Sequence, residues 1–297
     1  MLQQRHCRMM VFAAVLLLVS ASAQAQLAYR YTEIVVPGEG LFAQHINDKG
    51  EVIGLSVYNL DFVHGFFYDK GVITNIDAVP DFTGGTQPRG GNNRGQIVGN
   101  YFIGYGCCIE FHGFVYDNGV FSEFAMPGAI NTTPLAINDS GQIVGIARVS
   151  FADSVAFVYD NGVFTTFEVQ GTTPFPTGIN NRGQIVGYFN KNGIYRGFIY
   201  DDGVFKVLDG PVAGTTSTFV TGINDRGQVV GYAFAANKYY SFLYDHRGVF
   251  TLINPPAEAF RGSLEVMGIN NRGEIVGSYF DTTLFEIVGF VATPSRQ

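Results

Sequence analysis

The sequence contains no tryptophan and very little cysteine. Its three cysteines among 297 residues are Cys7 and the adjacent pair Cys107 and Cys108. Adjacent cysteines cannot cross-link distant parts of a chain, so a disulfide framework is excluded. Outside the cytoplasm this pair can bond to itself, bond to another chain or remain as free thiols. The fold must therefore be held together by its core and its turns.

Long apolar runs are scarce as well. The longest, residues 9–19, is about half of the roughly 20 residues that span a bilayer. It follows Arg5 and Arg8, and the small-x-small motif AQA that comes after it ends at Ala25. This pattern is typical of a secretion signal. We expect residues 1–25 to be a signal peptide cleaved after Ala25. The alternative interpretation is a membrane anchor. The protein is then secreted or periplasmic.

Charge is low and acidic. Charged residues make up 14% of the chain. Removing residues 1–25 leaves 16 basic and 25 acidic residues, a formal charge of −9. An acidic balance disfavours nucleic acid and anionic membrane surfaces as partners. We expect neither nucleic-acid binding nor membrane insertion after signal cleavage.

Glycine and aromatic residues are abundant, and they belong to a repeat. One phrase of the type INNRGQIVG occurs six times, in steps of 42 to 46 residues, with its first Asn at 47, 92, 138, 180, 224 and 270. A second phrase of the type GFVYDNGVF follows it, and breaks off in the last copy as GFVATPSRQ. Such internal periodicity predicts a repeat architecture.

Each unit is predicted to form four short strands. Asn-Asn/Asp-x-Gly places Asn and Gly at the favoured ends of a type I turn, and Asp-Asn-Gly predicts a tight hairpin. The strand cores Ile-Val-Gly and Phe-Val-Tyr are apolar without clean alternation. That pattern indicates a sheet covered on both faces, as in a propeller blade between two neighbours.

The two ends of the chain predict ring closure. The last copy lacks its fourth strand, and residues 31–38 (YTEIVVPG) match residues 121–128 (FSEFAMPG) position for position. We therefore predict an all-β, six-bladed β-propeller of four-stranded repeats, a single domain at 26–297 closed by the N-terminal strand. The alternatives are a β-solenoid, which would need polar capping units, and a sandwich array.

The repeat resembles the HAF extracellular repeat family, which is named for a His-Ala-Phe tripeptide before the Tyr-x-x-Gly hairpin. The tripeptide reads His64-Gly65-Phe66 and His112-Gly113-Phe114 here, and the histidine is replaced in the other four copies. The resemblance covers nearly all of the mature chain. It implies export and a repeat fold, and no particular activity.

The repeat divides the molecule into two faces. The turns between first and second strands and between third and fourth strands are nearly constant, whereas the second-to-third loops and the blade connections vary, as at 100–112 and 232–240. Loops that vary on a constant scaffold commonly carry function. The candidate ligand-binding residues on this variable face are Tyr105, Glu110, Tyr195, Lys238 and Tyr239.

Motifs for catalysis and metal binding are weak. The sequence has no Gly-x-Ser-x-Gly or His-Glu-x-x-His motif, and we expect no cofactor and no metal. Asp48, Asp139 and Asp225 in the repeated turns suggest calcium, but no bidentate Glu follows them, so a structural turn is favoured. Equivalent His64 and His112 favour a repeated hydrogen bond over zinc. Carboxylates that could serve glycosidic chemistry are Asp61, Asp81, Glu110, Asp153, Asp281 and Glu286.

These observations favour an exported bacterial repeat protein that acts as an extracytoplasmic binding or surface-interaction module. Its ligand is unknown, with a polysaccharide or a cell-surface protein as the expected partner. The alternative is a propeller enzyme, a hydrolase or lyase acting on extracellular glycans, and a purely structural surface protein is the third interpretation. Two carboxylates converging at the mouth of the central channel would favour the enzyme.

Overall fold

The computed structural model describes most of the chain after residue 25, namely residues 26–58, 62–78, 84–104, 109–260 and 262–295. The expected signal peptide, Tyr105, the pair Cys107 and Cys108, Asp61 and Asp81 lie outside the described residues. Within the described ranges, no helix is long and apolar enough to cross a membrane.

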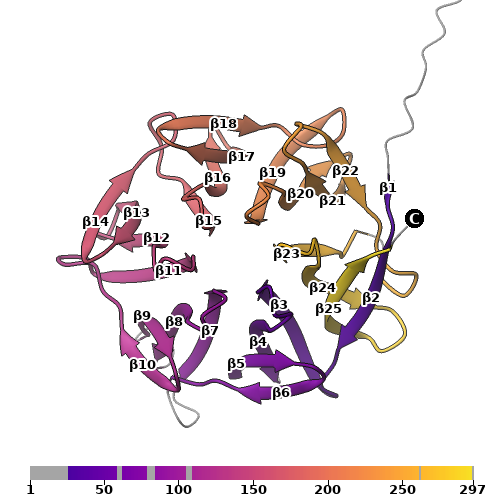
Figure 1. The fold of residues 1–297 in the computed structure, drawn as a ribbon, viewed down its shortest axis with the longest axis horizontal. Coiled ribbons are helices and arrows are strands. Elements are labelled where there is room, and N and C mark those ends of the chain that lie inside the picture. The colour runs from indigo at the N-terminus through magenta and orange to yellow at the C-terminus, as the bar shows by residue number, and fades with distance from the viewer. Residues whose placement is uncertain (1–25, 59–61, 79–83, 105–108, 261, 296–297) are drawn as a thin grey trace, which may run out of the picture.

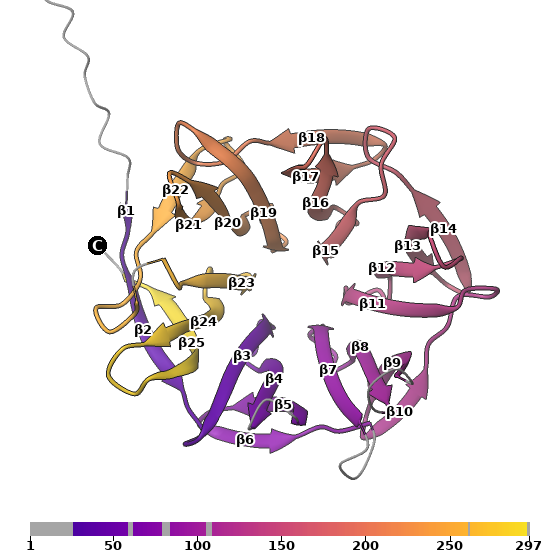
Figure 2. The same ribbon diagram turned by 180° about the vertical axis from the view of Figure 1, so that it is seen from behind.

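Six antiparallel sheets stand around a central axis as the blades of a propeller (Figures 1 and 2). Blade one contains β3 (Glu39–Ile46), β4 (Val52–Tyr58), β5 (Phe62–Asp69) and β6 (Val72–Asn75). Blade two contains β7 (Gly84–Gly91), β8 (Ile97–Ile103), β9 (Glu110–Asp117) and β10 (Val120–Glu123). Blade three contains β11 (Asn131–Ile137), β12 (Ile143–Arg148), β13 (Ser154–Asp160) and β14 (Val163–Phe167).

The second half of the ring has the same organisation. Blade four contains β15 (Phe175–Ile179), β16 (Ile185–Lys191), β17 (Ile194–Asp201) and β18 (Val204–Leu208). Blade five contains β19 (Thr215–Ile223), β20 (Val229–Ala235), β21 (Lys238–Tyr244) and β22 (Phe250–Ile253). Blade six contains β23 (Glu265–Ile269), β24 (Ile275–Asp281) and β25 (Glu286–Pro294). The predicted six-bladed propeller is confirmed.

The N-terminal strand completes blade six. Strand β2 (Tyr29–Ile34) pairs antiparallel with β25, from Tyr29 opposite Pro294 to Ile34 opposite Gly289. Figure 1 shows this indigo strand beside the yellow C-terminal strand. A two-residue strand, β1 (Gln26–Leu27), adds parallel to β22 of blade five, which the repeat did not predict. Residues 26–34 therefore join the last two blades and cover an edge that would otherwise be open.

The blades pack through one buried phenylalanine each. The Gly-Phe phrase places fully buried rings at equivalent positions of the six third strands, namely Phe66, Phe114, Phe157, Phe198, Phe242 and Phe290. The glycine of Ile-Val-Gly makes room for the ring: a Cβ on Gly54 would lie 2.8 Å from Phe66 and 2.1 Å from the Phe42 carbonyl oxygen. Apolar strand cores are thus buried on both faces, as the pattern without alternation predicts.

Candidate binding face

The repeated first turns meet around the axis and are joined by hydrogen bonds from blade to blade. The first Asn of each turn caps its own turn through Oδ1 and donates its side-chain N–H to the carbonyl oxygen of the next Asn, as Asn92 does to Asn138 at 3.0 Å. The six donors are Asn47, Asn92, Asn138, Asn180, Asn224 and Asn270, and the last of them bonds back to the first. One residue type therefore closes the turn and links the blades.

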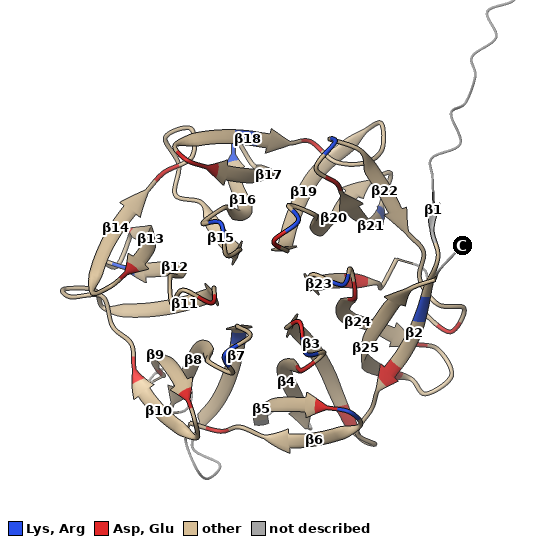
Figure 3. Cartoon of the chain, in the orientation of Figure 1, with Lys and Arg blue, Asp and Glu red and all other residues tan. Residues whose placement is uncertain are grey.

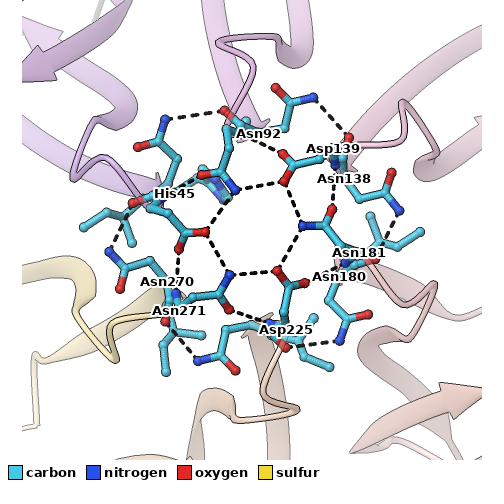
Figure 4. Close-up of a pocket in the computed structure, with 18 of the residues that line it drawn as sticks. His45, Asn92, Asn138, Asp139, Asn180, Asn181, Asp225, Asn270 and Asn271 are labelled. Atoms are coloured by element: carbon cyan, nitrogen blue, oxygen red, sulfur yellow. Dashed lines mark hydrogen bonds between the residues drawn. The ribbon is translucent and has the colours of Figure 1, made fainter.

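A second ring lies at the following position, where acid and amide alternate as Asp48, Asn93, Asp139, Asn181, Asp225 and Asn271 (Figure 4). Each backbone N–H of this ring donates to the Oδ1 of the next residue around the axis. Each Asn also donates to both flanking carboxylates, as Asn181 does to Asp139 and Asp225 at 2.8 and 2.9 Å. The alternation matches acceptors to donors, because a carboxylate only accepts and an amide N–H₂ offers two donors.

The electrostatics of this ring favour an ionised Asp139. Burial acts to raise the pKa of Asp139, but hydrogen bonds from Asn93 and Asn181, with Arg94 nearby, hold it below its usual value. Exposed basic side chains flank the ring at the next position of the turns, namely Lys49, Arg94, Arg182, Arg226 and Arg272. Figure 3 shows both signs of charge gathered at the inner turns. The aspartates are thus neutralised by built-in partners.

Little space remains inside this ring. The cavity that the turns enclose has a volume of about 60 Å³, and the next cavity along the channel about 30 Å³. His45 lies between them, where the other copies have only glycine or alanine, and burial lowers its pKa to about 4 against the opposing effect of Asp48 and Asp139. Small-molecule sites usually need about 300 Å³ or more. The turn face is therefore a closed structural junction.

The variable face of blades four and five carries a continuous aromatic band. We define it as Phe175, Tyr188, Tyr195, Phe219, Tyr232, Phe234 and Tyr239. Phe175 stacks on Tyr188 with ring centroids 5.1 Å apart, and Phe219 stacks on Tyr232 at the same distance. An edge contact of 5.1 Å between Tyr188 and Phe219 joins the two blades. Such ring pairs stabilise each other beyond the area they bury, so the band is rigid.

The band presents both ring surface and polar groups to solvent. Phe175, Tyr195 and Tyr239 are 36%, 39% and 46% exposed. The hydroxyls of the four band tyrosines have no hydrogen-bond partner among the residues that the structure describes. Burial, with Glu265 and neighbouring tyrosines, raises the pKa of Tyr232, so its hydroxyl stays protonated and can donate. An aromatic platform edged by free hydroxyls results.

Two charged residues lie beside the band. Burial raises the pKa of Glu265, at the start of β23, and the charge of this carboxyl helps to raise the pKa of Tyr232. Arg89 of blade two lines the channel, and its positive charge acts to lower the pKa of Tyr188. Its Nε is buried without a hydrogen-bond partner among the described residues. The Arg89 Nη2 donates to Gln87 Oε1 at 2.8 Å, so Nε is the buried nitrogen left unpaired. A carboxyl with a raised pKa is a feature of binding sites. Glu265 and Arg89 place hydrogen-bonding groups of both kinds near the aromatic platform.

The predicted site residues fall in two places on the variable face. Tyr195 and Tyr239 belong to the aromatic band, and Lys238 is exposed next to Tyr239. Glu110 instead lines a cavity between blades two and three. The structure thus brings together only part of the predicted set, with Tyr105 outside the described residues.

The prediction that these tyrosines lie in loops is wrong. Tyr195 is in β17 and Tyr239 in β21, and the connections before them are two-residue hairpins. Positive φ values at Asn192 and Gly193, and at Ala236 and Asn237, show why, since both central residues of the tightest hairpin turns need them. The strands therefore continue to the edge of the blade, and the ring positions are set by strand pairing.

Three of the candidate carboxylates are engaged in hydrogen bonds. Asp153 accepts a hydrogen bond from the Ser150 hydroxyl, Asp281 caps the backbone N–H groups of Thr283 and Leu284, and Glu286 accepts one from Gly38 N–H. Asp153 and Asp281 bond within their own turns, whereas Glu286, which lies opposite Asp281 in the paired strands, bonds the connection before blade one. Glu265, the carboxyl beside the band, was missed because it stands in a strand.

Comparison with solved structures shows the fold. The SapL1 lectin in complex with alpha methyl fucoside matches at 12% identity and a TM-score of 0.53, over 88% of this chain and 97% of the lectin. Virginiamycin B lyase from Staphylococcus aureus matches at 11% identity and a TM-score of 0.51, over 89% and 99%. TolB from Acinetobacter baumannii matches at 11% and 0.52, over 88% of this chain, which spans only 64% of TolB. No family model matches the chain, and no curated protein matches its sequence.

Proposed function

We propose that this protein is an exported carbohydrate-binding propeller whose aromatic band on blades four and five holds the sugar. The observation that supports this most is the band itself, with stacked rings, partly exposed faces and free hydroxyls on one rigid surface. Sugars present apolar C–H faces that lie flat on aromatic rings and hydroxyls that bond to the polar groups beside them. Arg89 and Glu265 supply a donor and an acceptor there.

The fold comparison supports a sugar as the ligand class. The SapL1 lectin, solved with alpha methyl fucoside, is a neighbour with the same architecture. Its residues are not carried over, because the two chains share only 12% identity. Export after cleavage at Ala25 belongs to the same proposal, and mass spectrometry of the mature N-terminus tests it.

A glycan array with the mature chain, residues 26–297, tests the binding proposal. We expect binding to a defined class of glycans, and loss of at least about five-fold in affinity for Tyr195→Ala and for Tyr239→Ala, since aromatic anchors commonly contribute more than about 1 kcal/mol. Tyr58→Ala is the matched control, because Tyr58 is 48% exposed at the variable end of blade one, far along the ring. Full affinity in a Tyr195→Ala, Tyr239→Ala double variant would contradict the proposal.

The same array should be followed for reaction products. Glycoside hydrolysis commonly needs two carboxyl groups across the bond. Among the described residues, Glu265 is the carboxyl whose charge raises the pKa of a band tyrosine, Tyr232. We therefore expect intact glycans after long incubation, and released sugars would support the glycan enzyme instead.

A further inference from the structure

A large cavity of the variable face lies outside the aromatic band, between blades two and three. It has a volume of about 420 Å³ and is lined by residues of β9, β10, β11 and β12. This volume is within the range of small-molecule sites, and it is several times the space inside the ring of turns. We call it the blade 2–3 cleft.

The repeat shows what is missing from this cleft. In blade one, His64 Nδ1 lies 3.0 Å from Asp77 Oδ2, and the Gly65 N–H donates to Asp77 Oδ1 at 3.1 Å. In blade four, Arg196 Nη1 lies 2.5 Å from Asp209. In both copies a basic side chain before the glycine meets an aspartate twelve positions after that glycine.

Blade two keeps the donors and lacks the acid. His112 and Gly113 repeat His64 and Gly65, but Ala125 stands where Asp77 would be, and all three residues of blade two line the cleft. His112 stacks on Tyr101 at 5.0 Å, which fixes its ring, and its Nε2 is buried without a hydrogen-bond partner among the described residues. The cavity therefore lies where blade two has no counterpart of the Asp77 carboxylate.

Nearby glutamates replace the aspartate only weakly. Glu123 Oε1 lies 3.4 Å from His112 Nδ1, a long hydrogen bond. Glu110 Oε2 lies 3.8 Å from His112 Nε2, which is too far for a hydrogen bond. Their side chains are 62% and 79% exposed, so water screens their charge. Both can turn away into solvent when another acceptor arrives.

The opposite wall adds a cation and an apolar rim. Arg148 of blade three lines the cleft, its guanidinium held by the carbonyl oxygens of Ser150 and Phe151. The cleft is also bordered by large apolar side chains that are 40%, 45% and 51% exposed, namely Ile109, Phe111 and Ile130. Exposed apolar side chains that gather around a cavity mark a place where an apolar group binds.

We propose that the blade 2–3 cleft binds a small carboxylate with an apolar body. Its carboxylate accepts hydrogen bonds from His112 Nδ1 and the Gly113 N–H, in the place that Asp77 takes in blade one. Its apolar body lies against the rim. This site is separate from the aromatic band and does not depend on the carbohydrate proposal.

Titration of the mature chain with three ligands of one shape tests the chemistry. Phenylacetate, 2-phenylethanol and phenethylamine are followed by NMR or calorimetry. We expect phenylacetate to bind at least about ten-fold more tightly than the other two. Tighter binding of the amine would show that the glutamates govern the cleft, and no saturable binding of phenylacetate up to about 10 mM would equally overturn the proposal.

Ala125→Asp tests the place of binding, because it restores the acid that blade one has. We expect this variant to lose phenylacetate binding at least about ten-fold and to keep or raise its melting temperature. Ala152→Asp is the control, since it adds the same charge at an exposed position outside the cleft. Unchanged affinity in Ala125→Asp would contradict the proposal. If that variant fails to fold, His112→Gln provides the same test, with an expected loss of at least about five-fold.

Discussion

The two faces of this propeller use the same residue types in opposite ways. On the turn face, the amides and carboxylates of Asn181, Asp139 and their neighbours bond to one another, and only about 60 Å³ stays open. On the variable face, tyrosine hydroxyls of the aromatic band have no partner among the described residues, and large aromatic rings stay partly exposed. Groups that satisfy each other stabilise the ring, and groups left unsatisfied are available to a ligand.

The largest effect is expected from opening the ring. Deleting residues 26–36 removes β1 and β2, so β25 keeps β24 but loses its outer partner, and Ile34, which is 1% exposed, no longer covers the core. We expect a large loss of stability and aggregation through the open edge. Thermal unfolding and size-exclusion chromatography measure both.

Deletion of residues 26 and 27 alone is the matched control. It removes only the two-residue strand β1, which pairs with β22. We expect a small change in melting temperature. A chain without residues 26–36 that melts like the intact mature chain would rule out closure by β2.

The second-largest loss of stability is expected from removing one amide of the second ring. Asn181→Ala deletes donors to Asp139 and Asp225 and the acceptor for the Asp139 N–H. We expect a loss of about 2–3 kcal/mol in the free energy of unfolding, because hydrogen bonds to charged groups are the strong ones. Ser140→Ala, at the exposed next position of a repeated turn, should change it by less than about 0.5 kcal/mol. Equal losses in urea unfolding would show that the ring adds nothing beyond the turn.

Lowering the pH should destabilise the protein through His45, the histidine in the channel. Burial holds the pKa of His45 near about 4, whereas an unfolded histidine titrates near 6.5. The unfolded state therefore binds the proton first, and stability should fall by roughly 2–3 kcal/mol as the pH drops from 6.5 to 4. His45→Gln, which does not titrate, should lack this part of the pH dependence. Identical pH profiles for the two proteins would contradict the burial of an uncharged His45.

The blades could be predicted from sequence because their signals are local. Asn-Gly and Asp-Gly fix hairpins within four residues, and a repeat of that signal at 42 to 46 residues fixes the number of blades. Closure could also be predicted, since residues 31–38 match a fourth strand.

The ring of turns could not be predicted, because its partners are about 45 residues apart and are close only once the propeller closes. Asp48 and Asn93 look like variants of one turn position, and the structure shows that their alternation is complementary. From the sequence, Asn181 is only the second residue of a repeated turn. Its two carboxylate partners come from neighbouring blades.

The binding face was predicted in part. Tyr195 and Tyr239 could be identified by their place near variable segments, but Tyr188 and Tyr232 were not, because they follow Ile-Val-Gly inside strands. A signal for them was present: only copies four and five have tyrosine directly after that phrase. The stacking of these rings across blades depends on strand register, which single copies do not reveal.

The separation of the two faces is the central claim, and a paired measurement tests it most directly. Melting temperature and dissociation constant for a glycan from the array are measured for Asn181→Ala and for Tyr195→Ala. We predict that the first lowers the melting temperature and keeps the affinity, and that the second keeps the melting temperature and weakens binding at least about five-fold. A folded Asn181→Ala that no longer binds, beside a Tyr195→Ala that binds normally, would contradict the account.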